Sequence, residues 1–108
     1  WSVYMVRRRD GKIYTGISKD VAARFEQHKH SPKQGARFLR GMGPLELLNQ
    51  AEVGDQASAM HVEREVKKLQ KDKKEEIASQ PHALAEMVAE ETAVYLLRKE
   101  KPESEKEK

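Results

Sequence analysis

Two short runs near the start of the chain are rich in Val, Ile, Tyr and Thr. They span residues 2–7 and 12–17, and the Arg-Asp-Gly sequence at residues 9–11 separates them. Runs of this composition on either side of a glycine-containing turn are typical of a β-hairpin. We therefore predict that these residues form two paired antiparallel strands.

The length of the hairpin loop decides which side chains share a face of the sheet. A two-residue loop at residues 10 and 11 places Tyr4 and Tyr14 on opposite faces, because one residue of register moves every side chain to the other side. A three-residue loop at residues 9–11 places both tyrosines on one face, and Gly11 suits the left-handed position that ends such a loop. The other face then holds Val3, Met5, Ile13, Thr15 and Ile17. This nearly continuous apolar set favours the three-residue loop.

Helical periodicity follows the hairpin. Ser18 or Asp20 can cap a helix from about Val21 to about Lys29, and the Ser-Pro sequence at residues 31 and 32 ends it. Residues 31–44 are rich in glycine and proline, so we expect mostly loop with a short helical turn at residues 36–40. The glycines and arginines of this loop suit backbone contact with phosphate.

A third strand is predicted over residues 45–53, and Asp55 can cap a long helix after it. The apolar positions of this long helix are Ala57, Met60, Val62, Val66, Leu69 and Ile77. Pro81 separates it from a last amphipathic helix that ends near residue 98. The predicted buried stripe of the last helix is Leu84, Met87, Val88, Tyr95 and Leu96. Such a stripe serves either the core or a partner-binding face.

These elements predict an α+β fold with a three-stranded antiparallel sheet flanked by helices. We expect this domain to span residues 1–80, with the extra C-terminal helix at residues 81–98 packed on or beside it. Residues 99–108 contain only Lys, Glu, Pro and Ser, so we predict a disordered charged tail.

Composition removes several classes of function. The chain has no cysteine, which excludes disulfide frameworks, thiolate zinc sites and cysteine nucleophiles. No apolar run approaches the roughly 18 residues of a membrane helix, so we expect no membrane partner and a cytoplasmic location. His28 and His30 form a His-x-His sequence, but on a helix two such residues point about 200° apart. A zinc site there is therefore not predicted.

Charge is distributed unevenly along the chain. Residues 1–50 hold ten Lys or Arg against four Asp or Glu, whereas residues 51–108 hold eleven against fourteen. The first half is therefore the better candidate for contact with a polyanion. The alternative is an ordinary solvated basic surface.

The order of several residues resembles the GIY-YIG nuclease superfamily over roughly residues 2–80. Ser2-Val3-Tyr4 resembles the first motif of that family, and Tyr14-Thr15-Gly16 resembles the second. Glu63 lies where the family has its metal-binding glutamate. Size, the Gly-Ala-Arg-Phe-Leu-Arg-Gly loop and the Lys67-Lys68 pair are most similar to the small stand-alone bacterial members. The chain departs from the pattern at Ser2 and Thr15, and no asparagine follows Glu63.

The resemblance implies an endonuclease that hydrolyses phosphodiester bonds in DNA with Mg²⁺ (or Mn²⁺), in DNA repair, recombination or processing. It assigns the catalytic roles to Tyr4, Tyr14, Arg24, His28 and Glu63. RNA remains an alternative substrate. We expect nucleic-acid contacts at Arg7, Arg8, Lys33, Arg37, Arg40 and Lys67.

Each of these residue types suits a step of phosphodiester hydrolysis. Glu63 would hold the metal together with waters and substrate oxygens, because Mg²⁺ is often bound by only one or two carboxylates. Arg24, on the helix after the hairpin and in the place of the family's catalytic arginine, matches two phosphoryl oxygens with its guanidinium fork. A tyrosine would orient or deprotonate water once nearby cations lower its pKa. His28, with an ordinary pKa in the neutral range, would add a proton transfer or a phosphate contact.

Two other readings of the sequence stay open. The scaffold can be a nucleic-acid-binding module that lost catalysis and uses the hairpin tip and the loop at residues 33–40. It can also be a subunit whose last helix binds a protein partner or a second copy. Without the resemblance, the tyrosines would be packing residues and Glu63 half of a surface pair with Lys67.

Overall fold

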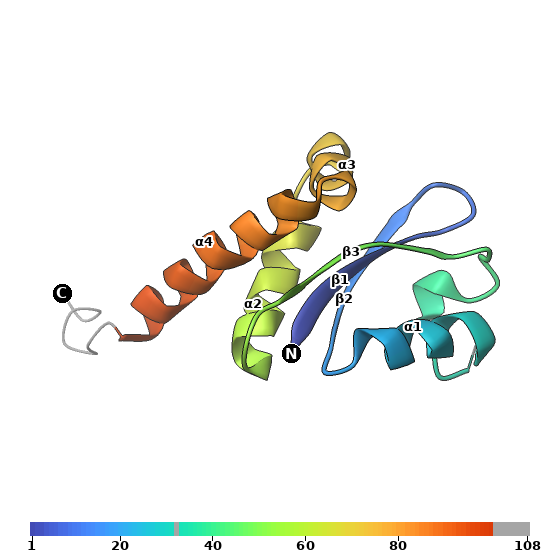
Figure 1. Cartoon of the computed structure of the whole chain (residues 1–108), viewed down its shortest axis with the longest axis horizontal. Coiled ribbons are helices and arrows are strands. Elements are labelled where there is room, and N and C mark those ends of the chain that lie inside the picture. Colours follow the sequence, from blue (N-terminus) through green and yellow to red (C-terminus); the bar gives the residue numbers. More distant parts are fainter. Residues whose placement is uncertain (32, 101–108) are drawn as a thin grey trace.

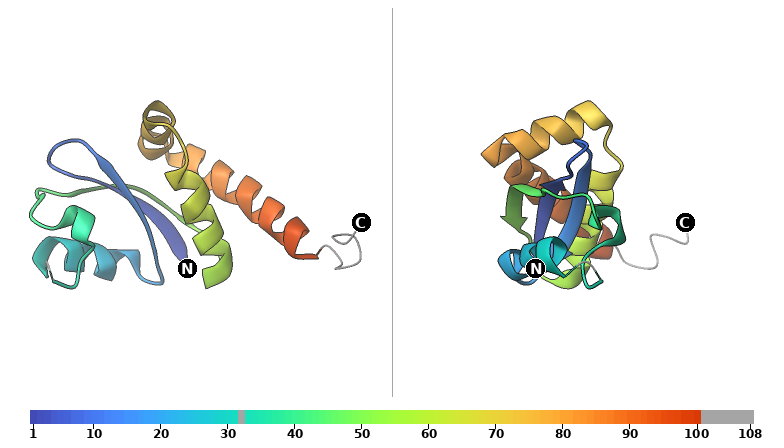
Figure 2. Two further views of the ribbon diagram at one scale, coloured as in Figure 1. Left: turned by 180° about the vertical axis from the view of Figure 1, so that it is seen from behind. Right: turned by 90° about the vertical axis from the view of Figure 1, so that its right-hand side faces the viewer.

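The computed structural model describes residues 1–31 and 33–100. A three-stranded antiparallel sheet with the order β2-β1-β3 forms its centre, from β1 (Ser2–Arg7), β2 (Ile13–Ser18) and β3 (Glu46–Glu52). Helix α1 (Val21–His30) and a 3-10 turn, η1 (Arg37–Leu39), lie on one side of the sheet. Helices α2 (Gln56–Lys67), α3 (Lys71–Ser79) and α4 (Pro81–Glu100) lie on the other side (Figures 1 and 2). The predicted α+β class and the extra C-terminal helix are confirmed.

The hairpin has the predicted three-residue loop. Tyr4 pairs with Gly16, and Tyr14 pairs with Val6, so both tyrosines share one face. Gly11 has a φ of 93°, the left-handed conformation that glycine adopts most readily. The apolar pattern of the two strands was therefore enough to predict the register.

Each face of the sheet has its own hydrophobic cluster. Under α2, α3 and α4 the cluster contains Val3, Met5, Val62, Val66, Ile77, Ala78, Leu84 and Val88. Under α1 and η1 it contains Tyr4, Val6, Val21 and Leu39. Because α4 supplies Leu84 and Val88 to the larger cluster, this part of its apolar stripe is core.

Two predictions about the helices are wrong. The single long helix after Asp55 is two helices, α2 and α3, joined by residues 68–70. In one straight helix Ile77 would lie about 16 Å beyond Val66 along the axis, yet the two residues share a core cluster. Burial of Ile77 therefore requires the chain to turn back.

Leu96, predicted in the buried stripe of α4, is 44% exposed. The C-terminal part of α4 runs away from the sheet (Figure 1), and the ring that packs there is Tyr95, 5.3 Å from the ring of His61. The predicted tail lies, from residue 101 onward, outside the described residues. No helix in the described part of the chain is long and apolar enough to cross a bilayer.

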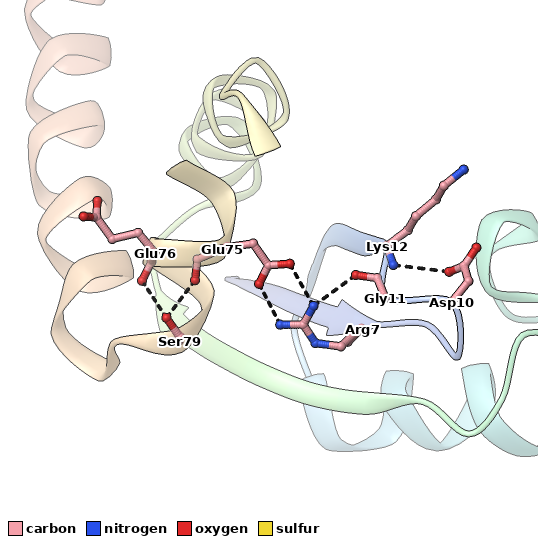
Figure 3. Close-up of polar contacts among 7 residues, drawn as sticks. All are labelled: Arg7, Asp10, Gly11, Lys12, Glu75, Glu76 and Ser79. Atoms are coloured by element: carbon pink, nitrogen blue, oxygen red, sulfur yellow. Dashed lines mark hydrogen bonds and ion pairs between the residues drawn. The ribbon is translucent and has the colours of Figure 1, made fainter. Parts of the chain in front are cut away.

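A bidentate ion pair joins the end of β1 to α3. Arg7 donates from Nη1 and Nη2 to the two carboxylate oxygens of Glu75 at 2.8 and 2.7 Å, and Nη1 also reaches the Gly11 carbonyl at 3.0 Å (Figure 3). The guanidinium holds the pKa of the Glu75 carboxyl below its usual value. This pair fixes the position of α3 beside the hairpin.

We expect Glu75→Gln to lower the free energy of unfolding by about 1 kcal/mol, because a bidentate arginine pair lies at the upper end of what partly exposed ion pairs contribute. Glu76→Gln is the matched control, since its carboxylate pairs with Lys73 on the exposed side of the same helix. Urea unfolding of both variants checks this. Equal effects would show that the Arg7 pair adds nothing special.

Candidate active site

Tyr4 and Tyr14 lie side by side over Gly16. Tyr4, on the central strand, is fully buried, while Tyr14, on the edge strand, is half-buried, and their ring centroids are 6.1 Å apart. A Cβ atom on residue 16 would lie 2.7 Å from the Tyr4 hydroxyl and 2.8 Å from Cε2 of Tyr14. Only glycine leaves room for both rings, which gives the Tyr-x-Gly sequence a physical reason.

His28 of α1 binds the hydroxyl of Tyr4. Its Nε2 lies 2.8 Å from the Tyr4 oxygen, and the backbone N–H of Ala36 donates to its Nδ1 at 3.0 Å. Since Nδ1 accepts, the neutral ring carries its proton on Nε2, which donates to the Tyr4 oxygen. The phenolic proton of Tyr4 is then left for another acceptor.

Burial lowers the pKa of His28 to about 4, and the charge of Arg24 adds to the shift. The neutral-range pKa expected from the sequence is therefore wrong, because that expectation took the imidazole to be solvated. Both ring nitrogens are engaged, so a direct phosphate contact by His28 is also not supported. Its place in the structure is that of a residue that positions Tyr4.

Arg24 lies one helical turn before His28. Its Nη1 donates to Oε1 of Gln27 at 2.9 Å and to the carbonyl of Gln34 at 2.8 Å. Burial raises the pKa of the Tyr4 phenol above its usual value, the neighbouring Tyr14 adds to that shift, and Arg24 opposes it. The guanidinium is therefore close enough to act on Tyr4, which is a neutral phenol at pH 7.

Glu63 is connected to the site by an ion pair with Lys67. The two residues lie one turn apart on α2, with Nζ of Lys67 3.5 Å from Oε2 of Glu63, whose side chain is 22% exposed. Lys67 and Tyr14 line the same cavity of about 250 Å³ at the outer edge of β2. The structure thus brings Tyr4, Tyr14, Arg24 and His28 into one cluster, and Glu63 is linked to the cavity of Tyr14 through Lys67.

A metal site at Glu63 would rest on one carboxylate. Across residues 1–31 and 33–100, no group of three or more His, Cys, Asp or Glu side chains is arranged to hold an ion. A single carboxylate with waters and substrate oxygens is a donor set that Mg²⁺ accepts. The residues present would therefore hold such an ion through Glu63 alone, with the other ligands coming from water and substrate.

Of the predicted nucleic-acid contacts, Lys67 lines the cavity beside Tyr14, and the other five fall into two groups. Lys33, Arg37 and Arg40 are exposed in and around the η1 turn. Arg7 is instead held by Glu75. Arg8 pairs with Asp10, donates to the Phe38 carbonyl at 3.0 Å and lies over the Phe38 ring. For Arg7 and Arg8 the geometry supports a structural role, because both guanidinium groups are bound by acceptors within the fold.

Phe38 and Lys74 are two site residues that the sequence pattern did not predict. The Phe38 ring stacks on Tyr14 with a centroid distance of 6.1 Å, and Lys74 lines the cavity beside Tyr14. The sequence did contain a signal for Phe38, because an aromatic residue stands there among the glycines and arginines of the loop. No signal was available for Lys74, because its position depends on the turn between α2 and α3.

Comparison with known proteins identifies relatives of this chain. The family described as the GIY-YIG catalytic domain matches residues 1–76. The UPF0213 proteins YhbQ of Escherichia fergusonii and of Escherichia coli K12 are each 40% identical over 89 residues, which is 82% of this chain and 87% of theirs. The solution NMR structure of the UPF0213 protein BH0048 from Bacillus halodurans is 34% identical, with a TM-score of 0.47, covering 78% of this chain and 90% of that one.

We expect Gly16→Ala to displace both tyrosine rings and to cost about 1–3 kcal/mol of stability, the usual range for an overpacked core. Gly43→Ala is the control, since a Cβ there meets only the Leu45 nitrogen, at 4.0 Å. Urea unfolding and the aromatic NMR signals of both variants measure the effect. Unchanged tyrosine signals in Gly16→Ala would contradict the packing described above.

The buried His28 predicts a loss of stability in mild acid. Between the ordinary pKa of 6.5 and the folded value of about 4, the unfolded chain takes up a proton that the folded chain does not. The free energy of unfolding should therefore fall as the pH drops through this window, by up to about 3 kcal/mol.

His28→Gln removes the titrating group and should flatten this part of the pH dependence. His30→Gln, at an exposed position two residues away, should keep it. Urea midpoints measured from pH 7.5 to pH 4.5 compare the three proteins. A wild-type slope that persists in His28→Gln would assign the effect to other groups.

Proposed function

Because the chain belongs to the GIY-YIG family, whose catalytic domain is that of a nuclease, we propose that it is a divalent-metal-dependent endonuclease acting on DNA. The observation that carries this proposal is the cluster of Tyr4, Tyr14, Arg24 and His28, in which the buried histidine holds one tyrosine through a 2.8 Å hydrogen bond. A packing role alone would not require a fixed histidine tautomer.

Cations around the tyrosines could stabilise the charge that develops during phosphodiester hydrolysis. The transition state carries negative charge on the phosphoryl oxygens, which fixed positive groups stabilise. Arg24 acts on the Tyr4 side of the cluster and Lys67 lines the cavity with Tyr14. A phosphoryl group in that cavity would meet the ammonium group of Lys67, while Arg24 would add its charge from the Tyr4 side of the cluster.

The two tyrosines differ in access. Tyr14 lines the open cavity, whereas Tyr4 is fully buried behind it. Tyr14 is therefore our candidate for orienting the attacking water in this conformation. Tyr4 receives the hydrogen bond from His28, which stabilises negative charge on its oxygen and supports a role as proton acceptor once cations lower its pKa.

Glu63 is our candidate ligand for Mg²⁺ or Mn²⁺. When bound, the ion would polarise a phosphoryl oxygen and lower the pKa of the attacking water. The pair with Lys67 at 3.5 Å holds the Glu63 side chain beside a residue that lines the cavity. This arrangement suits an ion that arrives together with the nucleic acid.

The test is cleavage of plasmid and branched DNA, with RNA of matched sequence, in Mg²⁺ or Mn²⁺. We expect Glu63→Gln and Arg24→Lys to reduce cleavage at least about a hundredfold, the loss typical of a missing transition-state contact. Glu65→Gln is the matched control, because Glu65 lies on the same helix and pairs with Lys68 at 2.7 Å. It should cut like the wild type.

Other outcomes separate the alternatives. Binding of DNA without cutting of any substrate would favour a nucleic-acid-binding module on the same scaffold. Cleavage that survives Glu63→Gln would remove this carboxylate from the metal site. Preference for the RNA strand would keep the chemistry and change the substrate.

A further inference from the structure

A groove begins at Tyr14 and leads along the outer edge of β2. The cavity of about 250 Å³ beside Tyr14 adjoins a second cavity of about 270 Å³, because Ile13, Phe38 and Lys74 line both. The second cavity continues to Gly11, Lys12 and Lys71 near the hairpin loop. The two form one path from Tyr14 to the start of α3.

Four lysines line this path: Lys12, Lys67, Lys71 and Lys74. The carboxylate that also lines it, Glu75, is held by both terminal nitrogens of Arg7 (Figure 3). The charge of Glu75 is thus already matched from inside the fold. What the groove presents outward is a row of ammonium groups, which favours a polyanion.

The floor of the groove is apolar where the two cavities meet. Phe38, which is 42% exposed, and Ile13 line both parts. Arg8 lies 4.3 Å over the Phe38 ring and the Tyr14 ring stacks on it, so the aromatic ring is held in place. Cations beside a fixed apolar surface suit a strand that carries phosphates together with sugars and bases.

We propose that this groove binds the sugar-phosphate backbone of the substrate strand on one side of the scissile bond, with Lys12, Lys71 and Lys74 contacting successive phosphates. The inference rests on the proposed function, because the path begins at the cavity of Tyr14 and Lys67. A strand cut beside Tyr14 must leave that cavity, and the groove is a continuous cationic route from it.

The opposite side of α3 has the reverse character. Lys73 pairs with Glu76 at 2.8 Å and lines a separate cavity with Glu86, Glu90 and Glu91. Polyanions are repelled there. Helix α3 therefore separates a basic groove from an acidic one. Lys71 and Lys74 face the basic groove, whereas Lys73 faces the acidic one, although all three carry the same charge.

This difference supplies a matched pair of variants. Lys71→Gln with Lys74→Gln removes two charges from the groove. Lys68→Gln with Lys73→Gln removes two charges from positions paired with Glu65 and Glu76. Both variants have the same net charge, and urea unfolding verifies that each is folded.

Binding is measured with a fluorescent DNA oligonucleotide in EDTA over a range of salt concentrations, so that no cleavage occurs. We expect the groove variant to bind at least about tenfold more weakly, with the slope of log K against log salt smaller by about 0.7–0.9 for each lysine that contacts a phosphate. The control should stay within about twofold of the wild type. Lys71→Arg with Lys74→Arg should bind like the wild type, because it keeps both charges.

Equal weakening of DNA binding in the two glutamine variants would overturn the proposal, because the lysines would then act through net charge alone. Their role at the edge of β2 would be to prevent pairing with another strand. Cleavage in Mg²⁺ is a separate readout. If the wild type cuts DNA and the groove variant binds DNA as tightly as the wild type, the groove proposal is contradicted and the nuclease proposal stands. Groove-dependent binding without any cutting supports the groove and contradicts the nuclease.

Discussion

The candidate site depends on one chain of hydrogen bonds, from the Ala36 N–H through His28 to the hydroxyl of Tyr4. It joins the loop after α1, the helix itself and the central strand. The backbone donor fixes the histidine tautomer, and burial keeps the ring neutral. Gly16 leaves the space in which both tyrosines can approach His28, with centroid distances of 5.9 and 5.6 Å. The geometry of the cluster is thus set by packing and backbone contacts before any substrate binds, which is what preorganised catalysis requires.

A second constraint, the Arg7 and Glu75 pair, joins the end of β1 to α3 on the other side of the sheet. It holds α3 beside the hairpin and matches the carboxylate that would otherwise oppose the lysines of the β2 edge. Arginines at the hairpin tip therefore serve nucleic-acid binding indirectly in our account. They shape and neutralise the surface, while lysines from α2, α3 and the hairpin present the charge.

The sequence was sufficient where local patterns determine structure. The hairpin register followed from Gly11 and an apolar face, and the caps at Asp20 and Asp55 marked two helix starts. It failed where distant packing decides. No glycine or proline marks the turn at residues 68–70, which exists because Ile77 must return to the core. The same turn brings Lys71 and Lys74 from the net acidic half of the chain to the basic groove, so a charge balance taken by halves did not reveal them. The burial of His28 was hidden for a similar reason, because the residues that cover it follow the helix in an irregular loop.

The central claim is that one nucleic-acid strand passes from the tyrosine cluster along the β2 edge. The most direct test is a crystal structure of Glu63→Gln bound to a DNA oligonucleotide. The account predicts a phosphodiester beside Tyr14 and Arg24, with neighbouring phosphates next to Lys71 and Lys74. DNA bound on the α4 side of the molecule, or with its phosphates away from both tyrosines, would contradict it.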